Sequence, residues 1–340
     1  MNKLGLASVA VMALTSVAAA GQYDPSNAIA GGDARSMGTF TGAQFDAIRH
    51  RTTSVETSSI YSTNWTSDSN GAAYTVGNLT PWTSAGNGTE PGQGGWIMYS
   101  TATTTTAASN TKINGGRPAG SSGTGQAMQI TGGSTASGSR YIYQDLSAGW
   151  AARNAGENTF WTEYESYFSA TQTSTNADGL ITYDTTGSAI LTGIYTQVGT
   201  ATSAGTTGKR GTIYGFSNYL NGTSVGNYIF NLTGTTVGSQ LFANAGGWTK
   251  YASNFNQNDG VVEWYVSVDG GANYTGFYVN GAAAGKDVQE IDFYSSSQRV
   301  GTNTSAGSMI FGSTMAYATP APGAVALVGL AGLMARRRKA

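Results

Sequence analysis

The chain of 340 residues contains no cysteine, a single histidine and six prolines, and only 10% of its residues are charged. The absence of cysteine excludes a disulfide framework, an iron–sulfur cluster and a thiol nucleophile. With His50 as the sole histidine, zinc catalysis and a Ser-His-Asp triad are both disfavoured. Average soluble domains carry about 25% charged residues, so polar contacts here must come mostly from uncharged side chains.

Glycine and threonine are abundant instead, with 49 and 46 residues. Threonine favours strands, and glycine and asparagine serve tight turns, so this composition predicts an all-β chain rather than a helical bundle. Five of the 17 basic residues lie near the two ends, which leaves 12 basic against 18 acidic residues between them, a net charge of about −6. Because phosphate contacts need clustered lysine or arginine, nucleic-acid binding is disfavoured.

The N-terminal residues 1–20 have the pattern of a secretory signal peptide. Lys3 precedes an apolar run over residues 4–17, and three alanines end at Ala20 before the chain turns polar. A cationic start, a short apolar core and small residues are typical of such a leader, so we expect export and cleavage by signal peptidase after Ala20. A buried N-terminal helix is the alternative, and the shortness of the apolar run disfavours it.

The C-terminal residues 319–340 form a tail with three parts. These are the residues Pro320, Ala321, Pro322 and Gly323, an apolar run over residues 324–335, and a cationic cluster of Arg336, Arg337, Arg338 and Lys339. The apolar run is shorter than the ~20 residues that cross a bilayer, and the cationic cluster would resist translocation. A membrane-surface helix with a basic end is the alternative interpretation.

This tail resembles the PEP-CTERM sorting signal of exported bacterial proteins, with Ala321 in place of the usual glutamate. The resemblance implies a C-terminal hydrophobic helix that anchors the chain transiently in the membrane. It also implies recognition and cleavage by an exosortase-like protease, followed by release or transfer to the cell surface.

Between the ends, short strand-like runs alternate with turns, and only residues 44–50 indicate a short helix. The runs cover residues 128–130, 140–144, 160–168, 179–183, 190–198, 212–219, 228–232, 261–268, 274–279, 288–294 and 309–317. The turn signals are Asp178-Gly179, Asn221-Gly222, Asp259-Gly260, Asp269-Gly270 and Asn280-Gly281. Residues 81–318 are therefore expected to form one antiparallel sandwich or barrel, preceded by residues 21–80 as edge strands or an extended arm. A parallel β-helix is the rival fold, but no fixed repeat period occurs.

From residue 92 onward the chain resembles the jelly-roll domains of concanavalin A-like lectins and glucanases. The resemblance rests on Gly92–Trp96, Gly125–Ile130, the run from Trp248 to Gly281, and Glu290–Tyr294 followed by Met309–Gly312. It implies an antiparallel jelly-roll β-sandwich of concanavalin A-like type.

The strand at residues 160–168 carries the candidate ligand-binding site. Because side chains alternate along a strand, Trp161, Glu163, Glu165 and Tyr167 share one face. Two carboxylates beside two aromatic rings could line a sugar-binding groove, and retaining glycosidases place such carboxyl groups about 5–5.5 Å apart. Laminarinase-like members of the resembling fold carry an E-x-D-x-x-E pattern, which is incomplete here. A solvent-facing acidic stripe is the plain structural alternative.

Two further acidic groups are weaker candidates. Glu290 and Asp292 share a face on a later strand, where a half-buried sheet is the favoured interpretation. Calcium could bind near Asp259, Asp269 or Asp287, although ordinary hairpin turns explain these residues better. No cofactor is expected.

These patterns together predict an exported cell-surface or extracellular-matrix protein that is not an enzyme, with extracellular polysaccharide as a candidate partner. The alternative is a secreted glycoside hydrolase of laminarinase-like fold, with Glu163 and Glu165 as acid/base and nucleophile. A purely structural coat protein is the third hypothesis.

Overall fold

The structure is a computed structural model. It describes residues 29–49, 57–81, 86–87, 90–100, 110–121, 123, 125–132, 139–171, 176–199, 210–232, 241–296 and 307–320. The expected signal peptide, the apolar run of the tail and its cationic cluster lie outside these residues, as does His50. In the described part of the chain, no helix has the length and apolar character needed to cross a bilayer.

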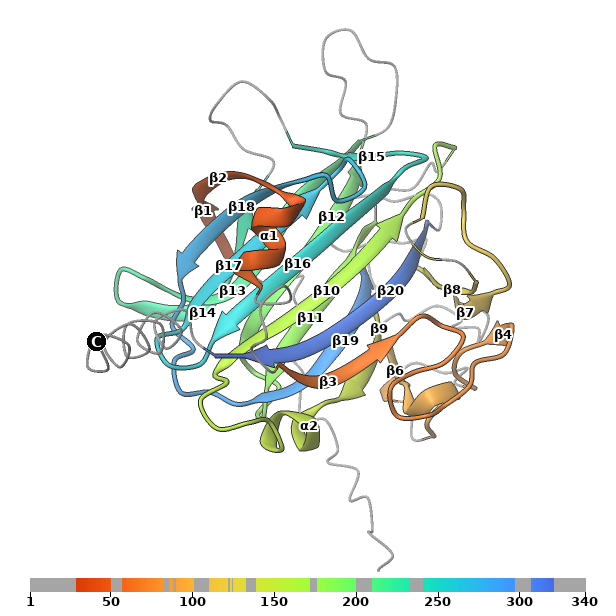
Figure 1. Ribbon diagram of the computed structural model, residues 1–340, viewed down its shortest axis with the longest axis horizontal. Helices are drawn as coiled ribbons and strands as arrows, with labels where there is room; N and C mark the ends of the chain where they lie inside the picture. Colours follow the sequence, from red (N-terminus) through yellow and green to blue (C-terminus); the bar gives the residue numbers. More distant parts are fainter. Residues whose placement is uncertain are drawn as a thin grey trace, which may run out of the picture.

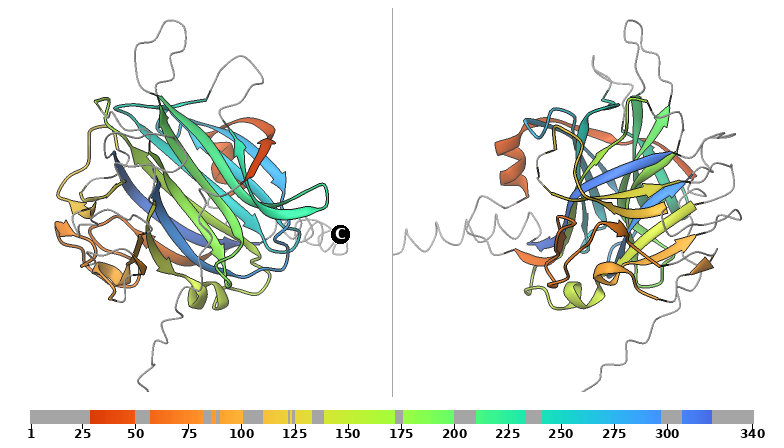
Figure 2. Two further views of the ribbon diagram at one scale, coloured as in Figure 1. Left: turned by 180° about the vertical axis from the view of Figure 1, so that it is seen from behind. Right: turned by 90° about the vertical axis from the view of Figure 1, so that its right-hand side faces the viewer.

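Two ten-stranded sheets lie face to face (Figures 1 and 2). Sheet A has the order β1 (Ile29–Asp33), β14 (Ser224–Asn231), β13 (Arg210–Asn221), β12 (Ile190–Gly199), β11 (Ala177–Asp184), β19 (Val288–Ser296), β9 (Ser139–Asp145), β6 (Ile97–Ser100) and β5 (Gly86–Asn87), with β15 (Ala243–Asn244) beside β13. Sheet B has the order β2 (Arg35–Thr41), β18 (Asn273–Asn280), β17 (Val261–Ser267), β16 (Trp248–Asn256), β10 (Thr159–Tyr167), β20 (Ser308–Thr319), β8 (Ala127–Thr131), β7 (Thr111–Asn114) and β4 (Gly77–Asn78), with β3 (Ser58–Thr63) beside β20.

The predicted all-β, antiparallel jelly-roll sandwich is confirmed. Within the described residues, the single parallel pairing joins β1 to β14, and every other ladder between strands is antiparallel. A parallel β-helix is therefore the wrong alternative, because it would stack parallel strands throughout.

The core between the sheets follows the period-two pattern of the sequence. Phe160 and Tyr164 of β10, and Phe168 just after it, point into this core, and on β19 Ile291 and Phe293 do the same. The residues between them face the outside of the sandwich, because successive side chains of a strand point to opposite faces. The outer face of each sheet is therefore where polar side chains of β10 and β19 gather.

The N-terminal part of the described chain joins both sheets. β1 and β2 are edge strands of sheets A and B, and β3 pairs with β20. The α1 helix (Gly42–Ile48) lies outside the sandwich against sheet B, and its first turn is closed by a capping box between Thr41 and Gln44 (Figure 1). Its buried residue Phe45 stacks on Tyr274 of β18, with ring centroids 4.0 Å apart. In the described residues, the other helical turns are η2 (Gln93–Gly95) and α2 (Ser147–Ala151).

Three of the predicted turns join neighbouring strands. Asn221-Gly222 connects β13 to β14, Asp259-Gly260 connects β16 to β17, and Asp269-Gly270 connects β17 to β18. Asp178-Gly179 was a wrong turn prediction, because both residues lie inside β11. A Cβ at Gly179 would lie 2.1 Å from the Ile194 carbonyl oxygen, so glycine is needed there for close strand packing. The predicted turn at Asn280-Gly281 is also not a hairpin turn, because Gly281 forms an isolated antiparallel β-bridge with Tyr219.

Candidate functional site: a pocket on the outer face of sheet B

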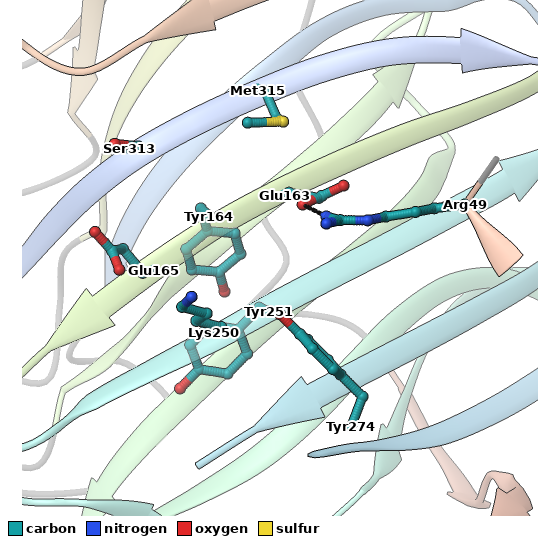
Figure 3. A pocket seen from close by; sticks show the side chains of 9 residues that line it. All are labelled: Arg49, Glu163, Tyr164, Glu165, Lys250, Tyr251, Tyr274, Ser313 and Met315. Carbon is teal, nitrogen blue, oxygen red and sulfur yellow. Dashed lines mark hydrogen bonds and ion pairs between the residues drawn. The ribbon is translucent and has the colours of Figure 1, made fainter. Parts of the chain in front are cut away.

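A pocket of about 200 Å³ opens on the outer face of sheet B. Glu163 and Glu165 come from β10 at the middle of the sheet, and Lys250 comes from the adjacent strand β16 (Figure 3). The lining residues are Arg49, Glu163, Tyr164, Glu165, Lys250, Tyr251, Tyr274, Ser313 and Met315. We call this the sheet B pocket.

Two buried tyrosines, Tyr164 and Tyr251, lie at the floor of the sheet B pocket. Tyr164 and Tyr251 stack at 4.8 Å in the core, and the Tyr164 hydroxyl donates a hydrogen bond to the Ile194 carbonyl at 2.8 Å. The Tyr251 hydroxyl lies 2.6 Å from Thr196 Oγ1. Burial raises the pKa of both tyrosines, which keeps them neutral.

Glu163 is held by groups from two other elements. Arg49, which follows α1, donates a charge-assisted hydrogen bond to Glu163 and another to Asp46, and the Tyr317 hydroxyl donates to the second oxygen of Glu163. The side chains of Arg49 and Glu163 are 15% and 14% exposed. The Arg49 guanidinium also lies 5.0 Å from the ring centroid of Phe45. Nearby carboxylates raise the pKa of Arg49 despite its burial, so its charge is permanent.

Glu165 is more deeply buried and has its own cation. Arg117 Nη1 donates to Glu165 Oε1 at 2.7 Å, and the Ser121 hydroxyl donates to the same oxygen at 2.9 Å. The side chains of Arg117 and Glu165 are only 3% and 4% exposed. Arg117 Nη2 also lies 3.0 Å from Ser313 Oγ, which ties the pair to β20. A Cβ at Gly312 would lie 2.2 Å from Glu165 Oε1, so that glycine makes room for the carboxylate.

The four residues expected to share a face divide into two groups. Glu163 and Glu165 both line the sheet B pocket, whereas Trp161 and Tyr167 do not. Trp161 is 2% exposed, because Phe45 of α1 packs over it and Tyr265 and Tyr317 stack beside it. This corrects the expectation of an open aromatic groove at Trp161.

Tyr167 lies further along β10, outside the sheet B pocket. Its ring packs against that of Trp248, with the two centroids 5.6 Å apart, and it remains partly exposed. Trp248 in turn donates a hydrogen bond from its indole N–H to the Pro118 carbonyl at 3.1 Å. Tyr167 therefore packs against Trp248 on the same face of the sheet and does not contribute to the pocket.

Sequence reasoning missed the residues that surround the two glutamates. Arg49, Arg117 and Lys250 lie far from them in the chain, and Tyr274 and Met315 come from other strands. The scarcity of basic residues is the one signal that could have indicated them. With so few cations between the ends, each lysine or arginine was a candidate partner for an acidic pair.

The other acidic candidates have different surroundings. Glu290 and Asp292 face outward from β19 but are buried, at 7% and 0% exposure. Burial, with a contribution from the Asp145 carboxylate, raises the pKa of Glu290 to about 7. The predicted half-buried strand with solvent-facing carboxylates is therefore wrong, because β19 is buried on both faces here. The pair does not line the sheet B pocket.

Each of the three aspartates considered for calcium accepts hydrogen bonds from protein groups. Asp259 accepts from the Val261 amide, and Asp287 accepts from the Trp150 indole. The pKa of Asp269 falls to about 2, because its turn donates several hydrogen bonds to it, among them the Asn273 amide at 3.0 Å. In the described residues, no three acidic, cysteine or histidine side chains gather as a metal-binding group.

No family model and no curated protein matches this chain. Among solved structures, it is similar to a protein of unknown function from Shewanella oneidensis MR-1, at 13% identity over 81% of this chain and 94% of that one, with a TM-score of 0.40. It is also similar to an alginate lyase from Klebsiella pneumoniae, at 10% identity over 58% and 82%, with a TM-score of 0.38. β-Agarase A from Zobellia galactanivorans matches at 11% identity over 72% and 81%, with a TM-score of 0.36. At such scores these likenesses carry no argument about activity.

Proposed function

We propose that this chain is an exported, non-enzymatic protein of the cell surface or extracellular matrix that binds glycans in the sheet B pocket. The observation that carries the proposal is the combination of groups in that pocket. Two oriented carboxylates and a lysine lie beside the Tyr274 side chain, on an outer face of the sandwich. Sugars present hydroxyls that both donate and accept, which suits carboxylates and an ammonium placed side by side.

The pairing of the two glutamates supports binding over hydrolysis. A retaining glycosidase needs one carboxyl group that holds a proton for the leaving group, next to an ionised partner. Here each glutamate has an arginine against it, Arg49 for Glu163 and Arg117 for Glu165. Each glutamate is thus oriented by an ion pair with a guanidinium, an arrangement that suits a carboxylate that accepts hydrogen bonds from a ligand.

The test of glycan binding uses the purified full chain on an array of extracellular polysaccharides, followed by titration calorimetry and a reducing-sugar assay. We expect binding without turnover, and we expect Glu163→Gln to weaken it by roughly 10- to 150-fold, since hydrogen bonds to charged groups contribute about 1.5–3 kcal/mol. Glu90→Gln is the matched control, because Glu90 is exposed and does not line the sheet B pocket.

Two outcomes would overturn parts of this proposal. Turnover that is lost in Glu163→Gln would replace the non-enzymatic assignment with the glycoside hydrolase alternative. Absence of binding to every polymer would remove the glycan role and leave a structural coat protein.

The export route is proposed from the sequence pattern of the two ends. The mature protein should begin after Ala20 and should lack the cluster from Arg336 to Lys339 once the tail is processed. Intact-mass spectrometry of protein recovered from the cell surface measures both ends. A surface protein that retains the cationic cluster would contradict processing by an exosortase-like protease.

A further inference from the structure

The cationic side chains around the sheet B pocket differ in whether they form ion pairs. Arg49 pairs with Glu163 and Asp46, and Arg117 pairs with Glu165. Lys250 lines the same pocket, yet across the described ranges its ammonium takes part in no ion pair. Both glutamates of the pocket therefore have a guanidinium partner, with Arg49 shared between Glu163 and Asp46, whereas the Lys250 ammonium forms no ion pair with a described residue.

The strand register directs Lys250 into the sheet B pocket. Lys250 of β16 stands opposite Glu165 of β10 on one side and Ser267 of β17 on the other, so all three share the outer face. A Cβ at Gly271 would lie 3.1 Å from Lys250 Nζ and 3.4 Å from Tyr274 Oη. Gly271 has φ +99, a conformation that favours glycine, so the space beside these two polar atoms is built into the turn.

Lys250 is half-buried, and its side chain lines the pocket together with Glu165 and Tyr251 (Figure 3). An ammonium is a compact point charge with three rotatable donors and no planar preference. It suits one oxyanion of a ligand whose remaining hydroxyls contact the carboxylates and Ser313.

We infer that the ligand of the sheet B pocket is an anionic glycan, and that Lys250 contacts its carboxylate or sulfate group. This inference rests on the proposed glycan-binding function and narrows it to acidic saccharides. The physical reason is the available positive charge at Lys250, which a neutral sugar would leave without a counterion.

The experiment compares polymers that differ only in charge. Polygalacturonate is set against its carboxyl-reduced form, and a sulfated galactan against its desulfated form, with the full chain titrated at several salt concentrations. We expect at least one acidic polymer to bind about 5- to 10-fold more tightly than its neutral partner, with an affinity that falls as salt rises. The two arms show whether the anion is a carboxylate or a sulfate.

Substitutions of Lys250 test whether this residue causes the preference for acidic polymers. Lys250→Gln should bring the acidic and neutral polymers to within about 2-fold of each other, whereas Lys250→Arg should retain most of the preference. Lys112→Gln is the matched control, because Lys112 lies on β7 of the same sheet and does not line the pocket. Circular dichroism checks that each variant is folded, and the salt dependence of the unaltered chain tests the inference without any variant.

The failures of the two proposals are distinguishable. Equal binding of acidic and neutral polymers that is still weakened by Glu163→Gln overturns the anionic ligand and leaves glycan binding intact. A charge preference that survives Lys250→Gln overturns the role of Lys250. Binding of none of the polymers overturns both proposals.

Discussion

Two pairs of carboxylates occupy equivalent positions on the two sheets, and their surroundings differ. Glu163 and Glu165 face outward from β10 of sheet B, and Glu290 and Asp292 face outward from β19 of sheet A. The first pair meets Arg49 and Arg117 beside a pocket. The second pair is buried, and the pKa of Glu290 rises to about 7.

The difference shows that spacing on a strand does not decide what a carboxylate pair can do. Both pairs have the same i, i+2 pattern and the same apolar alternation behind them. The sheet B pair is set apart by arginines that lie 114 residues from Glu163 and 48 residues from Glu165 in the chain. Side chains brought in from other elements thus turn one pair into a polar site and leave the other as part of a buried sheet.

The largest expected effect comes from removing the cation of the deeper glutamate. Arg117→Met should lower the free energy of unfolding by about 3–5 kcal/mol, because Glu165 would remain buried without its counterion. Denaturant unfolding of the purified chain at pH 7 measures this loss. A loss below about 1 kcal/mol would show that Glu165 does not depend on Arg117.

Two companion variants sharpen that measurement. Adding Glu165→Gln to Arg117→Met should recover a large part of the lost stability, because it removes the unpaired charge as well. Lys112→Met also removes a cation from sheet B but breaks no ion pair among the described residues, and we expect it to cost less than about 0.5 kcal/mol.

The alternation on β10 and β19 could be predicted from the sequence because it is a local property. A strand places Phe160 and Tyr164 on one face and Glu163 on the other whatever lies around it. The covering of Trp161 by α1 could not be predicted, since it depends on where a distant segment packs. The same is true of Asp178-Gly179, whose turn-like composition serves close strand packing inside β11.

The second prediction concerns the pH dependence of stability. It rests on two buried carboxyl groups of sheet A, Asp178 and Glu290, whose pKa values are raised. Burial raises the pKa of Asp178 on β11 to about 7, against a smaller opposing effect of the Ser295 hydroxyl, and Glu290 has a similar value. Between about pH 4 and pH 7 the folded chain therefore binds more protons than the unfolded chain, so stability falls as pH rises. We expect Asp178 alone to account for a loss of roughly 2–4 kcal/mol across this window.

Unfolding curves recorded from pH 4 to pH 8 for the unaltered chain and for Asp178→Asn test this prediction. The variant should match the unaltered chain near pH 4, where Asp178 is protonated in the folded state, and exceed its stability near pH 8. Glu290→Gln should act in the same direction, because Glu290 also has a raised pKa. If the stability of both variants changes with pH just as that of the unaltered chain does between pH 4 and pH 8, the assignment is wrong.

The smallest expected effect tests how Arg49 reaches Glu163. Thr41 accepts a hydrogen bond from the Gln44 amide at 3.3 Å and caps α1, which ends just before Arg49. Thr41→Ala should therefore cost about 1 kcal/mol of stability, which denaturant unfolding measures.

A double-mutant comparison tests whether α1 holds Arg49 in place. If it does, combining Thr41→Ala with Arg49→Met should cost less than the sum of the two separate losses, by about 0.5 kcal/mol or more. Thr41→Ala with Arg117→Met should instead be additive, because Arg117 comes from a different segment that α1 does not support. Additive losses in both double mutants would mean that Glu163 holds Arg49 in place without help from α1. Arg49 and Arg117 would then both be independent of the helix.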